Sequence, residues 1–266
     1  MVDLTPLLAD LDGETADLDA LVRALPGPDW NRATPAPGWT VAHQIAHLAW
    51  TDALSLRSLT APEEFSARTP PADAGLSRYV EAGAEEYLCA PDRLLRRWRA
   101  GARALADALA ATPADGRRLP WFGTAMSPAS MVTARIMETW AHGQDVADAL
   151  GRTRTPGARL RHIAHLGHRT FAHGFAAHGL DRPDTPVRVE LTAPDDSAWH
   201  FGPADAPDRV TGPALDFCLL VTQRRHPDDL DLRASGAAAR QWLHVAQAFA
   251  GPPGVKRRPS AATTDC

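Results

Sequence analysis

The first part of the chain repeats apolar and polar positions with the period of an α-helix. Between residues 4 and 25, leucines and Val22 recur three or four positions apart, which predicts an amphipathic helix. Similar spacing predicts further helices over residues 40–59, 76–88, 91–111, 127–151 and 156–178. Stretches rich in proline, glycine and polar residues separate most of these helices and predict loops. We therefore expect this part of the chain to form a helical bundle.

The pattern changes near residue 180. Residues 185–194 alternate apolar and polar side chains, as a strand with one buried face does, and residues 197–203 are its predicted hairpin partner. Short strands are also predicted over 208–212 and 229–236, with helices over 212–227 and 237–251. The expected fold class is thus α plus α/β. We expect a four-helix bundle over residues 1–180, a small α/β domain over 181–254 and a loose tail over 255–266.

Composition narrows the class of protein. Hydrophobic residues make up 44% of the chain and charged residues 23%, which is typical of a soluble globular protein. The formal net charge of −4 argues against a nucleic-acid partner. No apolar run is long enough to span a membrane, and the acidic N-terminus does not resemble a signal peptide. The sequence therefore predicts a cytoplasmic protein without a nucleic-acid or membrane partner.

The three cysteines, Cys89, Cys218 and Cys266, are far apart in the chain. No CxxC pair is present, so neither a disulfide framework nor a thiolate zinc site is indicated. Cys218 lies in an apolar run and is expected to be a buried small side chain. Metal ligands must therefore come from histidines and carboxylates.

Two predicted helices carry such ligands at helical spacing. Glu138 and His142 are four residues apart, as are His43 and His47, so each pair shares a helix face. Two imidazoles and one carboxylate are a common catalytic zinc set that leaves a fourth position open. His47, Glu138 and His142 would supply it, while His43 as a fourth ligand would close the open position. The alternative is a solvated Glu–His pair with hydrogen-bonded core histidines.

Other polar residues lie on or near these predicted helices. Asp145 follows His142 by three residues and is positioned to accept a hydrogen bond from a ligand imidazole. A second group of histidines spreads around most of one helix and has no nearby carboxylate, which favours polar contacts at the surface or between domains. Its members are His162, His165, His168, His173 and His178.

Two segments carry a resemblance to a known family. The stretches "PGWTVAHQIAHLAWTDAL" and "METWAHGQDVADAL" resemble the DinB-like superfamily, and specifically its mycothiol-dependent maleylpyruvate isomerases. This resemblance implies a zinc ion in the N-terminal bundle and a smaller domain similar to sterol carrier proteins. It implies that His47, Glu138 and His142 bind the metal, with Asp145 matching the trailing aspartate of the motif.

The resemblance also implies roles for residues around the metal. The family uses an arginine of the small domain over the zinc, and Arg224 or Arg225 would take this catalytic role here. Their position near the end of a predicted helix has another explanation, since cations there complement the helix dipole. His43 would line the pocket, and Trp50 would either wall the site or fill the core.

The expected chemistry follows from this set. A thiol has a pKa of about 8.5, and coordination to a metal favours the nucleophilic thiolate. The resemblance implies mycothiol as cosubstrate, so that the protein would be an isomerase or S-transferase acting on a small electrophile. Two alternatives stay open: a thiol-independent metal-dependent hydrolase or cyclase, and a non-enzymatic binder with a structural metal. The metal is expected to be Zn²⁺ or another divalent transition metal.

Overall fold

The computed structural model describes residues 3–70, 75–113, 115–255 and 257–259. The chain divides into two compact units, Met1–Arg154 and Thr155–Cys266, and each is described by itself. Most of the predicted tail, Cys266 included, lies outside the described residues.

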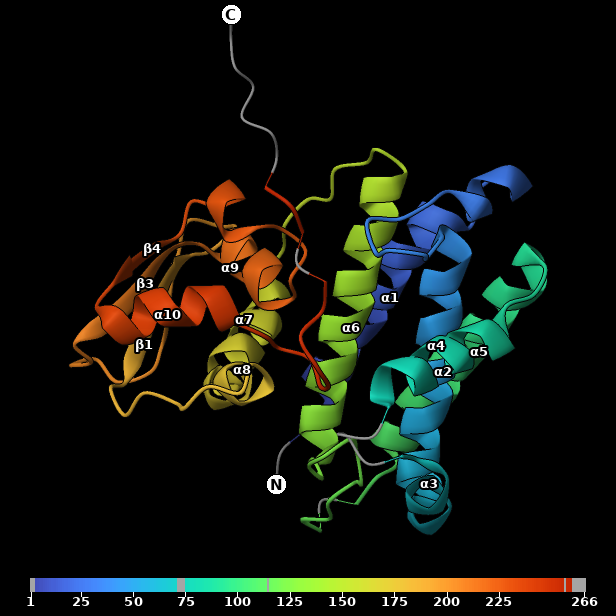
Figure 1. The fold of residues 1–266 in the computed structure, drawn as a ribbon. Helices are drawn as coiled ribbons and strands as arrows, with labels where there is room; N and C mark the ends of the chain where they lie inside the picture. The colour runs from blue at the N-terminus through green and yellow to red at the C-terminus, as the bar shows by residue number, and fades with distance from the viewer. Residues whose placement is uncertain (1–2, 71–74, 114, 256, 260–266) are drawn as a thin grey trace, which may run out of the picture. The chain divides into compact units, whose positions relative to one another are not determined.

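Four long helices build the first unit: α1 (Thr5–Val22), α2 (Val41–Thr60), α5 (Pro91–Ala110) and α6 (Pro128–Ala149). Contacts run from α1 to α6, from α6 to α2, from α2 to α5 and from α5 back to α1, which closes the bundle (Figure 1). The prediction of a helical N-terminal region is confirmed. No helix in the described part of the chain has the combined length and apolarity that a membrane span requires.

Buried apolar side chains hold the bundle together. Ile45 and Leu48 of α2 pack with Leu94 and Trp98 of α5, and each of these side chains is at most 1% exposed. Short elements complete the unit: η1 (Gly27–Asn31), α3 (Pro62–Arg68) and α4 (Leu76–Tyr87).

Helix α3 lies in the polar, proline-containing stretch between the predicted helices 40–59 and 76–88, where the sequence pattern predicts no helix. The helix begins at Pro62, a residue suited to a first helical position because its missing N–H is not needed there. Its only buried side chain, Phe65, stacks on Trp121 at 5.6 Å between ring centroids. A single apolar anchor was too weak a periodic signal to predict this helix.

The second unit contains a four-stranded sheet in the order β2-β1-β3-β4. Its strands are β1 (Val187–Thr192), β2 (Ala198–Phe201), β3 (Asp208–Pro213) and β4 (Arg233–Ser235). The predicted β1–β2 hairpin is present with Val189 opposite Phe201, whereas β1 and β3 run parallel. The remaining elements are α7 (Leu160–Arg169), α8 (Phe171–Ala177), α9 (Ala214–Val221), η2 (Pro227–Asp229) and α10 (Ala237–Val245).

The boundary between the units differs from the expected one at 180/181. Helices α7 and α8 group with the sheet rather than with the bundle. Close packing explains this: Gly167 of α7 lies so near Val221 of α9 that a Cβ would come within 2.8 Å of it. The predicted helix 156–178 is also interrupted, because α7 ends at Arg169 and α8 starts at Phe171.

Candidate metal centre

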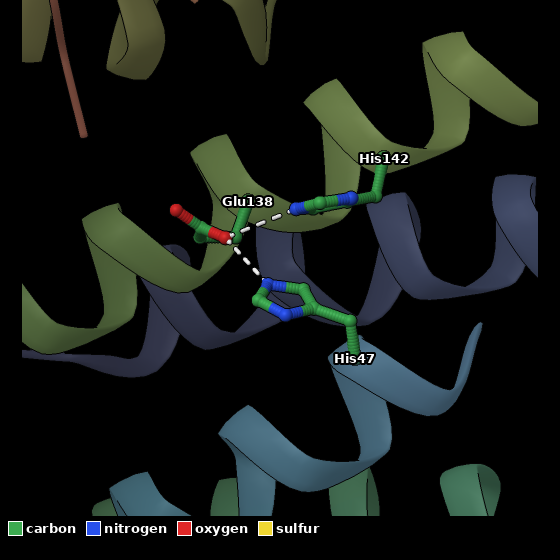
Figure 2. Close-up of side chains that lie close together, drawn as sticks. All are labelled: His47, Glu138 and His142. Atoms are coloured by element: carbon green, nitrogen blue, oxygen red, sulfur yellow. Dashed lines mark hydrogen bonds and ion pairs between the residues drawn. The ribbon is translucent and has the colours of Figure 1, made fainter. Parts of the chain in front are cut away.

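Helices α2 and α6 bring three potential ligands together inside the bundle (Figure 2). Oε2 of Glu138 lies 3.3 Å from Nε2 of His47 and 3.3 Å from Nε2 of His142. The potential ligand atoms all lie within 4.8 Å of one another. Among the described residues, no other group of three or more His, Cys, Asp or Glu side chains comes this close.

These distances fit a tetrahedral ion. Ligands about 2.1 Å from a zinc ion are separated by about 3.4 Å at the tetrahedral angle. Charge-assisted hydrogen bonds between nitrogen and a carboxylate are shorter, at about 2.7–2.9 Å. The observed nitrogen–oxygen distances of 3.3 Å are therefore closer to the separation of two ligands around one ion than to the length of a charge-assisted hydrogen bond.

Burial and hydrogen bonding set the charge of Glu138. Burial raises the pKa of its carboxyl group, but hydrogen bonds with His142 and His47 outweigh burial and hold the pKa well below its ordinary value. Glu138 is thus ionised near neutral pH. The His47 side chain is 7% exposed, against 13% for His142 and 23% for Glu138, so the cluster reaches the solvent on the Glu138 side.

Aromatic rings enclose the two imidazoles. Trp39 lies against both of them, 5.3 Å from the His47 ring and stacked at 6.0 Å on the His142 ring, between centroids. Trp50 lies 6.1 Å from His47 on another side and is 5% exposed. Trp50 is therefore a buried residue in contact with a predicted ligand, and its role as a wall of the site stays a prediction. The sequence reasoning assigned no role to Trp39, although the residue lies in the "PGWT" segment.

His43 does not join the cluster. Its Nδ1 accepts a hydrogen bond from the backbone N–H of Thr40 at 3.2 Å and lies 2.8 Å from the Thr40 hydroxyl. This reciprocal arrangement caps the start of α2, where Thr40 is the N-cap residue. The His43 imidazole thus has a structural role in the helix, four residues before His47.

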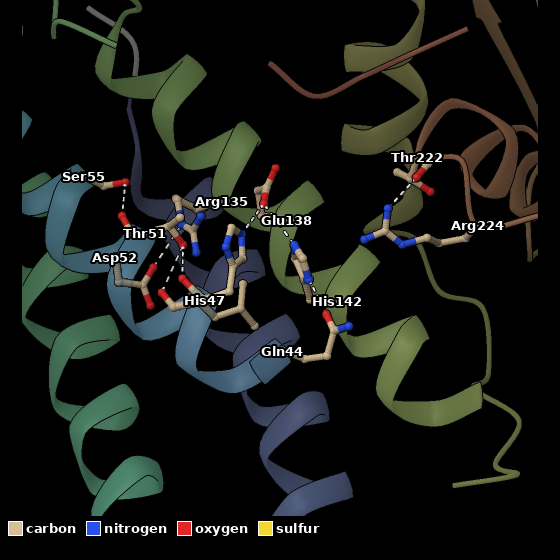
Figure 3. A network of polar contacts seen from close by, with 11 residues as sticks. Gln44, His47, Thr51, Asp52, Ser55, Arg135, Glu138, His142, Thr222 and Arg224 are labelled. Atoms are coloured by element: carbon tan, nitrogen blue, oxygen red, sulfur yellow. Dashed lines mark hydrogen bonds and ion pairs between the residues drawn. The ribbon is translucent and has the colours of Figure 1, made fainter. Parts of the chain in front are cut away.

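The hydrogen-bond partner of His142 is a residue that the sequence reasoning missed. Gln44 Oε1 lies 2.5 Å from Nδ1 of His142 (Figure 3). The sequence predicts that Asp145 accepts a bond of this kind. Asp145 is 1% exposed, and its role beside the metal stays a prediction. Gln44 precedes His47 by three residues, so helical spacing places both on one face, and this signal was available.

The second unit holds the other candidate residues. Arg224 donates from Nη1 to the carbonyl of Thr222 at 2.6 Å, and Arg225 donates to the carbonyl of Arg224 at 2.7 Å, just beyond the end of α9. Their expected position over the metal stays a prediction.

The second histidine group makes local contacts. His168 stacks on Phe201 at 6.3 Å between centroids, and Nε2 of His173 bonds the carbonyl of Phe249 at 3.0 Å. Nδ1 of His178 lies 2.9 Å from the carbonyl of Gly174 on its own helix. The three histidine rings thus make local packing and hydrogen-bond contacts within the second unit.

Comparison with known sequences places the cluster within a matched region. A profile of the mycothiol maleylpyruvate isomerase N-terminal domain matches residues 11–147, and a profile for wyosine base formation matches residues 183–235. Two uncharacterized proteins from Mycobacterium tuberculosis strains, MT0041 and Rv0036c, are each 52% identical over 258 residues. Each alignment covers 97% of this chain and 100% of the relative.

Two solved structures share the fold. The crystal structure of a mycothiol-dependent maleylpyruvate isomerase superposes with a TM-score of 0.61 at 18% identity, covering 88% of this chain and 93% of that chain. A mutant of that isomerase, in which one histidine is replaced by alanine, gives a TM-score of 0.60 at 16% identity with the same coverage. At these identities the likeness concerns the fold: a helical N-terminal region followed by a small domain with a mixed sheet.

Proposed function

Because the chain belongs to the family of the mycothiol maleylpyruvate isomerase N-terminal domain, we propose that it is a zinc-dependent enzyme using mycothiol. In this proposal, His47, Glu138 and His142 hold the metal, and a small electrophile is isomerised or receives the thiol. The solved neighbours are described as mycothiol-dependent maleylpyruvate isomerases, which makes maleylpyruvate the first electrophile to test.

The observation that carries the proposal is the convergence of two imidazoles and one ionised carboxylate within 4.8 Å. A Lewis-acidic ion bound by this set would lower the pKa of a coordinated thiol and favour its thiolate form. The state of Cys218 agrees with the use of an external thiol. Cys218 is fully buried, and burial raises the pKa of its thiol, so this group is a poor nucleophile.

The surrounding residues have distinct tasks in this proposal. Trp39 and Trp50 lie against the ligand imidazoles and exclude water from their sides. The guanidinium group of Arg224 or Arg225 would bind a carboxylate of the electrophile in a bidentate manner and stabilise developing negative charge. We further propose that the small mixed-sheet domain is of the sterol-carrier type.

The position of His43 favours an enzyme over a binder with a structural metal. A closed structural site needs four protein ligands, and His43 was the candidate for the fourth. His43 is not part of the group of ligand atoms that lie within 4.8 Å of one another, and its Nδ1 is engaged with Thr40 at the start of α2. A three-ligand set equally suits a thiol-independent hydrolase or cyclase, and the choice between these enzymes rests on whether a thiol binds.

The test measures metal content and thiol binding separately. Wild-type protein is expected to copurify with about one zinc ion, whereas His47→Ala, Glu138→Gln and His142→Ala lose it. His200→Ala is the control, because this exposed histidine lies on β2. Equal, negligible zinc in the wild type and in all variants would show that the metal proposal is wrong.

Thiol use is tested on the cobalt-loaded protein. Mycothiol is expected to produce a sulfur-to-cobalt charge-transfer absorption, and S-methylated mycothiol is the control that cannot form a thiolate. With metal bound but no such absorption at millimolar mycothiol, the thiol-independent hydrolase or cyclase becomes the better proposal. With the absorption present, turnover of maleylpyruvate and other activated alkenes identifies the electrophile.

A further inference from the structure

Gln44 sits at the centre of a buried chain of hydrogen bonds that begins outside the metal cluster. Its side chain lies on α2 and is completely buried. Gln44 Nε2 donates to Oγ1 of Thr34 at 2.8 Å, and Oγ1 of Thr34 donates to the carbonyl of Trp39 at 2.9 Å. At its other end, Gln44 Oε1 faces Nδ1 of His142 (Figure 3). This series of hydrogen bonds thus joins the turn before α2 to a predicted metal ligand on α6.

The donor and acceptor of each hydrogen bond in this series follow from the Trp39 carbonyl at its end. The Trp39 carbonyl can only accept, so the Thr34 hydroxyl must donate to it. Thr34 then receives a proton from its other neighbour, which must be the NH₂ group of Gln44. The amide oxygen of Gln44 is therefore the atom that faces His142, and it accepts the proton on Nδ1.

This direction determines the form of the His142 imidazole. A neutral imidazole carries one N–H, and with that proton on Nδ1 its Nε2 has a lone pair. Nε2 is the atom that lies 3.3 Å from Oε2 of Glu138. In the other tautomer, an Nε2–H would donate to Glu138 and occupy the space between the two ligands. The accepting oxygen of Gln44 disfavours that tautomer.

We propose that Gln44 is a positioning residue that keeps His142 in its metal-binding tautomer, and that Thr34 and the Trp39 carbonyl orient the Gln44 amide. The inference rests on the proposed metal-binding function and extends it to residues outside the ligand set. It also assigns a role to the turn over residues 34–39. Gly38, at φ +78°, allows this turn to bring the Trp39 carbonyl back to the Thr34 N–H at 2.8 Å.

Substitutions at Gln44 separate positioning from packing. Gln44→Met keeps the length of the side chain but removes the acceptor, and we expect roughly a 10–100-fold loss of zinc affinity in chelator competition. Gln44→Glu keeps an oxygen that accepts from Nδ1 but loses the N–H that donates to Thr34, so it is expected to restore only part of the affinity. Thr34→Val, which removes only the outer link, is expected to cause a smaller loss.

The matched control is Gln144→Met. Gln144 is a buried glutamine of the same bundle, but its amide donates to Asp148 at 2.8 Å. We expect Gln144→Met to keep the zinc affinity of the wild type and the visible spectrum of the cobalt-loaded protein, whereas Gln44→Met changes both. If Gln44→Met folds and matches the wild type in affinity and spectrum, the positioning role is wrong.

A measurement on the wild type tests the tautomer without any variant. In the metal-free protein, nitrogen chemical shifts of ¹⁵N-labelled histidine are expected to show a proton on Nδ1 of His142, with or without a second proton on Nε2 donated to Glu138. A proton resting mainly on Nε2 would overturn the inference even if Gln44→Met did not fold. This result is independent of whether the wild type binds zinc, so failure of the metal proposal and failure of the positioning role are distinguishable.

Discussion

Asp52 of α2 and Arg135 of α6 form a buried ion pair, with Nε of Arg135 donating to Oδ1 of Asp52 at 2.9 Å (Figure 3). The pair joins the same two helices that supply His47, Glu138 and His142. The exposed fractions of the two side chains are 7% for Asp52 and 2% for Arg135. The ion pair therefore lies in the part of the bundle on which the spacing of the metal ligands depends.

Breaking this pair is expected to destabilise the bundle. Arg135→Met leaves a buried carboxylate without its cation, which costs roughly 3–5 kcal/mol of unfolding free energy. The double variant Asp52→Leu with Arg135→Met is expected to lose less, because no charge stays buried. Urea unfolding of the metal-free proteins measures both. Arg117→Ala, at the exposed pair with Asp115, is the control without measurable effect; equal losses in the single and double variants would contradict the argument.

Two helical glycines differ sharply in the space around them. A Cβ on Gly83 would lie 2.1 Å from the Trp50 indole, whereas the nearest atom to a Cβ on Gly101 is 4.0 Å away. Gly83→Ala is expected to cost about 1–3 kcal/mol through overpacking. Gly101→Ala should be neutral or stabilise by up to about 1 kcal/mol.

Metal affinity gives a second measurement on this glycine pair. Because Trp50 lies 6.1 Å from His47, we expect its displacement in Gly83→Ala to weaken zinc binding as well. Chelator competition and urea midpoints on both variants check these expectations. Indistinguishable results for Gly83→Ala and Gly101→Ala would show that Trp50 adjusts at no cost.

The two arginines beyond α9 are expected to affect catalysis rather than metal binding. If one of them binds a substrate carboxylate, Arg224→Ala or Arg225→Ala lowers kcat/KM by about 10²-fold, which corresponds to roughly 2.7 kcal/mol. Lysine at the same position should restore little, because it cannot form the bidentate contact. Zinc content should stay at the wild-type level. Unchanged kcat/KM in both alanine variants would show that neither arginine has a catalytic role.

The second unit is expected to lose stability on acidification. Burial lowers the pKa of His168, and the positive charges of His165 and Arg169 add to this. The folded pKa is below the unfolded value of about 6.5, so the unfolded state binds the proton more readily. The stability contribution is therefore present above pH 6.5 and is lost as the pH falls through the folded pKa.

Unfolding midpoints at pH 7.5 and pH 5 test this pH dependence. His168→Phe, which retains a ring against Phe201, should lose less stability between the two values than the wild type does. His200→Ala, at an exposed position, should behave like the wild type. If the stability of His168→Phe falls as steeply with pH as that of the wild type, another group causes the loss of stability.

The sequence by itself determined the features that depend on local spacing. Apolar periodicity predicted the long bundle helices, and the four-residue interval of Glu138 and His142 placed both on one face of α6. The Thr40 N-cap could also be read from the sequence, because capping involves residues only three positions apart. Each of these predictions depends on a geometry that is complete within one helix.

Only the tertiary structure decided which groups meet across elements. It brought Gln44 to Nδ1 of His142, and it placed Trp39 against both imidazoles. It also grouped α7 with the sheet, through the close fit of Gly167 on Val221. Such contacts depend on how helices pack against one another. Helical periodicity identifies which residues lie on the same face of a helix, but not which side chain of another element contacts that face.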